Sequence, residues 1–256
     1  MNIPAQTVKS LLSQANVKSK FEEILRERAN AFTANLAVMV NNNAALSKCD
    51  PMSVISAAVV AASLDLPIDP NLGFAHIVPY GDKAQFQIGV KGFIQLAMRS
   101  GQYSRIGVTE IYEGQLLDEN PLTGEYTFDF KAKKSETIIG WAAYFKTVNG
   151  FEKTLYWPVE KIKKHGLRFS QTFKKGFGLW KDDFDSMAAK TVLKALLSKW
   201  GILSTEMQNA VKFDQGVVKS VETQEVEYLD NDPIAAAFDD GPVKGKKVTT
   251  EKLELK

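Results

Sequence analysis

The order of the expected elements predicts an α+β fold in which a small, mainly antiparallel sheet packs against helices. Three observations carry this prediction. Apolar residues recur at helical spacing over 5–66, strand-like runs joined by turns occupy much of 73–157, and helical spacing returns over 182–211. After residue 213 acidic and small polar residues replace the periodic pattern, which is typical of a flexible tail.

The N-terminal region, about 5–66, is expected to be helical. Residues 5–45 keep apolar side chains at helical spacing, with Phe21 and Leu25 as one example. Asp50 and Pro51 then form a typical helix start, an N-cap side chain followed by proline in the first turn. This pair predicts a helix over 51–64.

A mixed α/β part is expected over 67–212. Two short strands, 73–80 and 84–88, are separated by a hairpin-length turn that contains Gly81. The pattern of 89–100 predicts a helix, and Gly101 follows it at the position where a left-handed residue usually ends a helix.

Strands dominate the next part of the chain. The turn Val148-Asn149-Gly150 is a strong hairpin signal between two apolar runs. The expected strands are 105–112, 127–130, 137–147 and 151–157.

Helices return after Pro158. A short helix is expected over 158–165, followed by a loop rich in Lys, Phe and Gly over 166–178. The last strong helix is expected over 182–199, and a shorter one over 205–211. These elements complete an expected core of 1–212, and 213–256 is expected to be a flexible acidic tail whose apolar island, PIAAAF, is a possible partner-binding segment.

Positive charge is concentrated in one part of the chain. Residues 131–212 hold sixteen Lys and Arg against seven Asp and Glu, although the formal charge of the whole chain is only +2. Aromatic residues are interleaved with these cations. Because cations bind a phosphate backbone and aromatic rings stack on unpaired bases, single-stranded nucleic acid is the expected partner. The alternative is a solvated basic surface above an aromatic core.

Several function classes lack their sequence signals. The chain has no apolar run of membrane-spanning length, no signal-peptide pattern and one cysteine, Cys49, so a cytoplasmic location is expected. The segment Gly89-Val90-Lys91-Gly92 does not match a phosphate-binding loop, and two distant histidines do not make a zinc site. We therefore expect no cofactor, no metal and no enzymatic activity, but a binding protein that acts stoichiometrically.

Three separated blocks of sequence resemble the RecT family of phage single-strand annealing proteins. The first two are CDPMSVISAAVVAASLDLPIDPNLGFAHIVPYG and QFQIGVKGFIQLAMRSGQ, and the third is WKDDFDSMAAKTVLKALLSKWGILSTEMQNAV. They occur in the family's order and at its spacing. The resemblance covers about 10–212 and does not extend to the tail.

The resemblance implies a function. Proteins of this family bind single-stranded DNA, pair it with a complementary strand without nucleotide hydrolysis, and assemble into rings or helical filaments. The family acts beside a 5′→3′ exonuclease, and host single-strand-binding protein is a further expected partner through the tail. The implied core is a small sheet with packed helices.

Ten residues are the candidates for DNA contact. Lys190 and Lys194 lie four positions apart on the expected polar face of the 182–199 helix, and Lys91 and Arg99 match basic positions of the second block. The 166–178 loop and its flank are expected to grip the strand, and they contribute Phe173, Lys174, Lys175, Phe177, Trp180 and Lys181.

Two other functions stay open at this point. One is a single-strand-binding protein that coats DNA without annealing it. The other is a metal-dependent nuclease that would use Asp182, Asp183 and Asp185, although acidic residues at a helix start more often cap the helix and offset its dipole.

Overall fold

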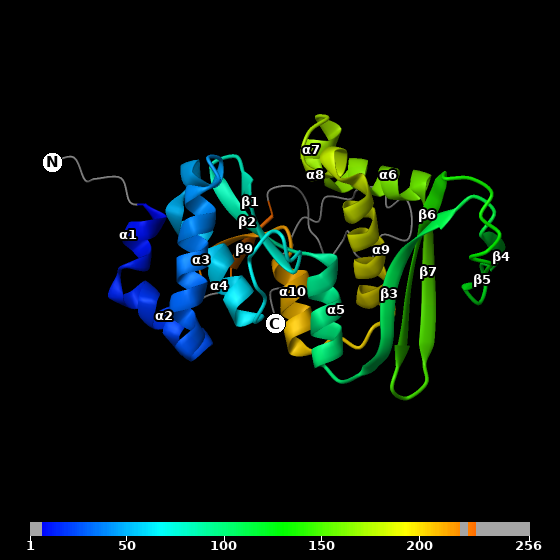
Figure 1. Ribbon diagram of the computed structural model, residues 1–256, viewed down its shortest axis with the longest axis horizontal. Coiled ribbons are helices and arrows are strands. Elements are labelled where there is room, and N and C mark those ends of the chain that lie inside the picture. The colour runs from blue at the N-terminus through cyan, green and yellow to red at the C-terminus, as the bar shows by residue number, and fades with distance from the viewer. Residues whose placement is uncertain (1–6, 221–224, 229–256) are drawn as a thin grey trace, which may run out of the picture.

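The computed structural model describes residues 7–220 and 225–228. It confirms the α+β class, because helices pack against small antiparallel sheets. Figure 1 shows an elongated arrangement in which the N-terminal helices lie at one end, a three-stranded sheet lies toward the other, and α9 stands between them. Within the described ranges, no helix combines the length and apolarity that a membrane crossing requires.

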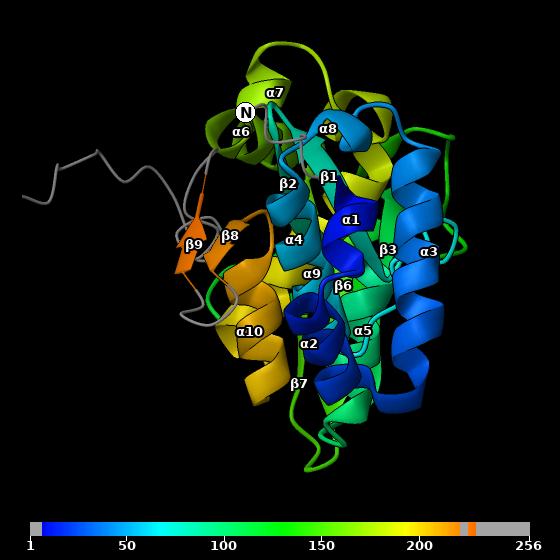
Figure 2. The same ribbon diagram turned by 90° about the vertical axis from the view of Figure 1, so that its left-hand side faces the viewer.

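The N-terminal helices form a layered cluster. The helices α1 (Val8–Leu12) and α2 (Ala15–Leu25) pack on α4 (Pro51–Ser63), and α3 (Ala29–Asn41) packs on α1 and α2, as Figure 2 shows for this end of the molecule. The Asp50 side chain accepts hydrogen bonds from the first backbone N–H groups of α4, as the sequence predicts. Such a cap contributes about 1 kcal/mol. The expected 5–45 helix is broken into pieces, and Arg26 adopts a positive φ of 53° at one break.

The hairpin of β1 (Ala75–Tyr80) and β2 (Lys83–Ile88) leads directly into α5 (Val90–Arg99). All three elements lie within two residues of their predicted bounds. A Cβ atom at Gly89 would lie 2.1 Å from the carbonyl oxygen of Gly73, so the backbones meet more closely than any other residue permits. Glycine at this position therefore allows α5 to begin tight against the hairpin.

The largest sheet has the strand order β3–β6–β7, formed by β3 (Tyr103–Tyr112), β6 (Ile138–Thr147) and β7 (Glu152–Pro158). The turn at Asn149-Gly150 joins β6 to β7 as predicted. A second hairpin, β4 (Leu116–Asn120) with β5 (Glu125–Phe128), packs its aromatic side chains on Tyr156 of this sheet. The sequence pattern predicts part of β5 but misses β4, whose residues are mostly exposed.

The expected loop over 166–178 is partly helical. The helix α6 (Val159–Phe169) runs four residues beyond its predicted end, and α7 (Gln171–Lys174) and α8 (Leu179–Asp182) follow. Gly166 permits this packing, because a Cβ atom there would lie 3.0 Å from the rings of Phe173 and Trp180. The glycine and aromatic residues that suggest a loop therefore allow α6, α7 and α8 to pack closely against one another.

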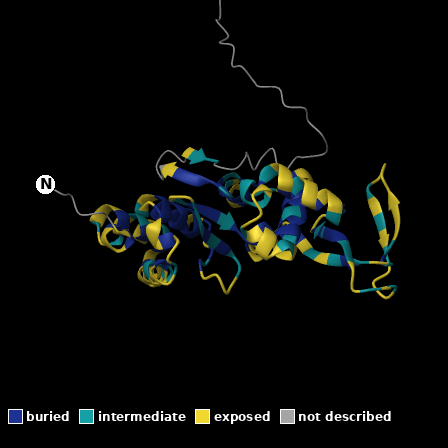
Figure 3. Ribbon diagram, turned by 90° about the horizontal axis from the view of Figure 1, so that it is seen from above, coloured by how far each residue is buried: buried dark blue, intermediate teal, exposed yellow. Residues whose placement is uncertain are grey.

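The helix α9 (Phe184–Trp200) packs on the three-stranded sheet and is followed by α10 (Thr205–Phe213). Figure 3 shows that burial is concentrated where the helices meet the sheets, whereas the β4–β5 hairpin is largely exposed. The main hydrophobic core is continuous from the N-terminal helices to α9 and α10.

The chain stays packed beyond the expected boundary at residue 212, which is a correction to the sequence-based division. Phe213, Asp214, Val217 and Val218 are buried. The strands β8 (Val217–Ser220) and β9 (Glu225–Glu227) pair with each other, and the backbone N–H of Phe86 donates to the carbonyl of Gly216. The PIAAAF segment lies outside the described residues.

A buried ion triad joins α9 to this C-terminal turn. The ammonium groups of Lys190 and Lys194 lie 2.8 and 2.7 Å from the two carboxylate oxygens of Asp214, which is completely buried. The same carboxylate accepts a hydrogen bond from the backbone N–H of Ile88 in β2. One side chain therefore ties together three segments that are distant in the sequence.

Replacing Asp214 with asparagine is expected to lower the free energy of unfolding by about 3–5 kcal/mol, because it leaves two buried ammonium groups without a counter-charge. Urea denaturation followed by circular dichroism measures this loss. Asp118→Asn on the exposed strand β4 is the control and should change stability by less than about 0.5 kcal/mol. Equal stability of the two variants would contradict the structural role of the triad.

Acid should weaken the triad. Burial alone would raise the pKa of the Asp214 carboxyl, but the charges and hydrogen bonds of Lys190 and Lys194 outweigh it and hold that pKa below its usual value. The unfolded chain therefore binds the proton first, and this stability is lost as the pH falls from about 4 through the folded-state pKa. The difference in urea midpoint between the wild type and Asp214→Asn should narrow over that range. A constant difference would contradict the assignment.

A candidate nucleic-acid interface

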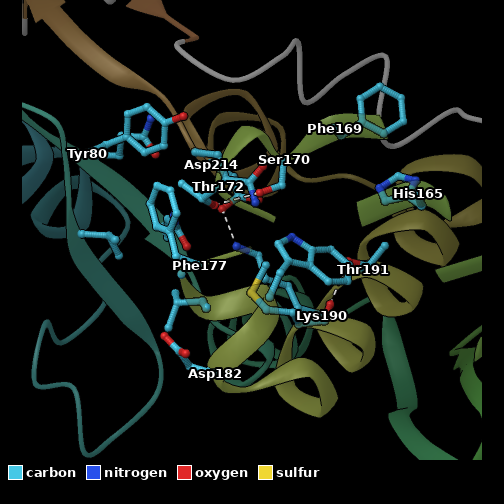
Figure 4. A pocket seen from close by; sticks show the side chains of 18 of the residues that line it. Tyr80, His165, Phe169, Ser170, Thr172, Phe177, Asp182, Lys190, Thr191 and Asp214 are labelled. Carbon is cyan, nitrogen blue, oxygen red and sulfur yellow. Dashed lines mark hydrogen bonds and ion pairs between the residues drawn. The ribbon is translucent and has the colours of Figure 1, made fainter. Parts of the chain in front are cut away.

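A groove separates the β1–β2 hairpin from α8 and α9. Two adjoining cavities of about 280 and 520 Å³ make up this groove. They share lining residues on both walls, including Val78 and Gln87 on the hairpin and Lys190 on α9. Figure 4 shows the smaller cavity, with Lys190 and Asp214 near its centre and Phe177 and Tyr80 on one side.

The hairpin wall is polar because of strand alternation. Successive side chains of a strand point to opposite faces, so Gln85 and Gln87 share one face while Phe86 and Ile88 point into the core. Across the hairpin, His76 is the partner of Gln87 and lines the larger cavity. Burial and the charge of Lys190 lower the pKa of His76, which favours the neutral imidazole.

The floor of the groove carries an excess of positive charge. Lys190 and Lys194 line the smaller cavity, and Asp214 neutralises only one of them. Burial holds the pKa of Lys190 below its usual value, and Asp214 acts in the opposite direction. The side chain of Gln85 lines the same cavity, is 1% exposed, and its Nε2 atom has no hydrogen-bond partner.

The prediction that Lys190 and Lys194 lie on an exposed polar face is wrong. Their exposed fractions are only 6% and 8%. Helical spacing places the two lysines together correctly, but it contains no information on Asp214, which lies 24 residues after Lys190. Their role in DNA contact stays a prediction, and if they act they do so from the floor of the groove.

The rim of the smaller cavity contains the segment that was expected to grip the strand. The Phe177 side chain is 53% exposed and lines the cavity, and Lys174 and Lys175 are exposed on and just after α7. Trp180, which was also expected to contact the strand, is placed differently. Its ring is buried and stacks on Phe173 at a centroid distance of 5.5 Å, so it supports the rim from within.

Exposed cations extend from this rim along α6. Residues 159–183 hold seven basic and three acidic side chains. The ammonium group of Lys161 lies over the ring of Trp157, 4.5 Å from its centroid. The other exposed cations of this stretch are Lys163, Lys164, Arg168, Lys174, Lys175 and Lys181.

The two cations expected on α5 separate in the structure. Lys91 is exposed and lines the larger cavity, at a helix start that has no side-chain cap. Arg99, at the other end of α5, donates to the carbonyl oxygens of Leu64 and Asp65 at 2.9 and 3.2 Å. It therefore caps the end of α4 and does not line either cavity.

The three aspartates of the nuclease alternative surround the start of α9. Asp183 is its N-cap and accepts a hydrogen bond from the backbone N–H of Ser186. Asp182 and Asp185 are exposed. Among the described residues, no group of three or more His, Cys, Asp or Glu side chains is placed to hold a metal ion.

Several groove residues were missed by sequence reasoning. The alternation of Gln85 and Gln87 within an apolar strand is a visible signal of a polar wall. Ser170 and Thr172, whose hydroxyl oxygens lie 3.0 Å apart, line the smaller cavity without any motif that marks them. Asp214 carries no local signal, because its partners come from another helix.

Comparison with known proteins identifies the family. Residues 30–229 match the model of the RecT family. The chain is 49% identical to the uncharacterized protein YqaK of Bacillus subtilis (strain 168), across 99% of this chain and 93% of that protein. It is 29% identical to protein RecT of Escherichia coli (strain K12), across 67% of this chain and 65% of that protein. Family membership supports single-stranded DNA binding and strand annealing in recombination. The expected kinship is confirmed, and the chain belongs to the RecT family.

Proposed function

We propose that this protein binds single-stranded DNA in the groove and anneals it to a complementary strand without nucleotide hydrolysis, in phage-type recombination. The observation that carries the proposal is the combination of a buried lysine floor, a polar hairpin wall and a rim of exposed cations with Phe177. Cations attract the strand independently of its sequence, and an exposed ring stacks on any base.

Annealing requires that the base edges stay available for pairing. A strand held by its phosphates keeps its base edges free, because phosphate contacts do not use them. With the phosphates on the groove floor, the bases would lie toward the open side. The exposed lysines of α6 and α7 would then hold the strand, or the new duplex, above the groove. The protein would act stoichiometrically and not as an enzyme.

The proposal includes assembly and partners. We propose a homo-oligomer, either a ring or a helical filament on DNA, located in the cytoplasm and working beside a 5′→3′ exonuclease. Contact with a host single-strand-binding protein is assigned to the region after residue 228, which lies outside the described residues.

A protein that coats strands without annealing them is the alternative function. Mixing complementary labelled strands with the protein distinguishes the two functions. Only an annealing protein makes duplex form faster than it forms from the strands without protein.

Annealing by the purified protein is expected to proceed without ATP and in excess EDTA. The physical reason is that the groove offers charge and stacking, which require neither nucleotide hydrolysis nor a metal ion. A fluorescence-quenching assay with complementary oligonucleotides measures the rate under each condition. A strict need for ATP or a divalent cation would overturn the mechanism, and cleavage of the oligonucleotides with Mg²⁺ would favour the nuclease alternative.

Binding is expected to weaken steeply with salt. If each protomer neutralises about 4–6 phosphates, the slope of log affinity against log salt should lie near −3 to −4 for single strands. Replacing Lys174 and Lys175 together with glutamine should make the slope shallower by about 1.4, at about 0.7 per phosphate contact. Lys9→Gln with Lys18→Gln, on exposed positions of α1 and α2, is the matched control and should leave the slope unchanged. Equal slopes for both pairs would remove α7 from the interface.

A further inference from the structure

The charges at the groove floor do not balance. Two buried ammonium groups share one buried carboxylate, so the cluster has a net charge of +1 when both lysines are protonated. The nearby His76 favours its neutral form, and Asp182, at the rim of the same cavity, is exposed to solvent. An uncompensated charge in a buried site is unfavourable, and one monovalent anion would compensate it.

A second, independent observation also indicates a missing acceptor. The Nε2 atom of Gln85 donates to nothing in the structure, although the residue is almost completely buried in the wall of the same cavity. Buried amide groups are nearly always hydrogen-bonded, so an unpaired one requires an explanation. The hydroxyl groups of Ser170 and Thr172 line this cavity as well and add a possible third donor.

We propose that the groove floor is a subsite for one phosphodiester group, received by the ammonium of Lys190 and the side-chain amide of Gln85. The inference rests on the proposed function, because the strand supplies the phosphate. Gln85 lines the smaller cavity and Lys190 lines both, so this subsite lies in the smaller cavity, next to its junction with the larger one. Lys194 and Asp214 form the neutral pair that holds Lys190 in place.

The two contacts should have different salt signatures. A lysine that binds a phosphate releases counterions, so its loss makes the salt slope shallower by about 0.7, whereas the loss of a neutral amide donor leaves the slope unchanged. A hydrogen bond to a charged group is strong enough that its loss weakens binding about tenfold or more. The neutral contact therefore lowers affinity by the same factor at every salt concentration.

The experiment uses the full chain with a labelled oligothymidylate over a range of salt concentrations. Gln85→Leu should weaken binding about tenfold with an unchanged slope, and Lys190→Gln should make the slope shallower by about 0.7. Gln95→Leu, on the exposed face of α5, is the matched control and should bind like the wild type. A folded Gln85→Leu variant that binds like the wild type would overturn the subsite.

Stability separates a binding role from a structural one. Leucine removes an unsatisfied buried donor at similar size, so Gln85→Leu should unfold at a urea concentration equal to or above that of the wild type while it binds the strand less well. A variant that loses stability and affinity together would assign Gln85 a structural role. The comparison of stability with affinity for Gln85→Leu does not depend on Lys190→Gln, so it tests the subsite even if the Lys190→Gln variant fails to fold.

Inorganic phosphate tests the anion apart from the strand. Phosphate should raise the thermal midpoint above that in sodium chloride of equal ionic strength, and this rise should be larger for the wild type than for Gln85→Leu, because exclusion of phosphate from the surface stabilises both proteins equally. If phosphate acts through Gln85 but strand affinity does not depend on Gln85, the occupant is a free anion and the strand assignment is wrong. If the wild type responds to phosphate but neither binds nor anneals strands, the proposed function is wrong while the anion site stands.

Discussion

The structure depends on one buried carboxylate. Asp214 accepts from Lys190 and Lys194 of α9 and from the backbone of β2, and so it fixes the helix, the hairpin and the C-terminal turn relative to one another. The groove lies between these same elements. Ionic contacts at its base therefore help to hold the two walls in place, together with the hydrophobic core beneath them. The carboxylate thus adds an ionic joint between two walls that also share one hydrophobic core.

A cluster of this kind is a poor way to gain stability. Well-packed apolar side chains of similar volume are often as stable as a buried ion pair, or more so, because desolvation offsets the attraction. The unpaired amide of Gln85 is a further cost to the folded state. Buried charge and an unsatisfied donor on the same cavity wall are what a binding site requires, since a ligand gains most from groups that water does not already satisfy. In the proposed function, the floor of the groove exchanges stability for affinity, and the exposed cations of α6 and α7 attract the strand at long range.

Local patterns predict the elements far better than they predict the site. Asp50 before Pro51, the glycine between β1 and β2, and Asn149-Gly150 act through their own backbone geometry, so their consequences can be read from neighbouring residues. The helix α7 was missed because Gly166 makes room for two aromatic rings, and this reason appears only in three dimensions.

Lys190 and Lys194 show the same limit: their spacing is correct, but their burial depends on Asp214. Arg99 is a similar case, because it caps the end of a helix 35 residues earlier in the chain, which its own neighbours do not indicate; its contact with DNA stays a prediction. Family kinship was correct because it rests on whole blocks of sequence, which carry such long-range contacts implicitly.

The late position of Asp214 has a consequence during synthesis on the ribosome. The chain emerges from its N-terminus at about 5–20 residues per second, so the 24 residues from Lys190 to Asp214 take about 1 to 5 s to appear. Throughout that interval α9 carries two ammonium groups with no carboxylate to receive them, and its link to β2 through Asp214 cannot form. If translation stops within this stretch, the chain has no Asp214, and Lys190 and Lys194 have no carboxylate with which to be buried. Such a product lacks the contact that joins α9 to the hairpin, so the groove is completed only after Asp214 has been synthesised.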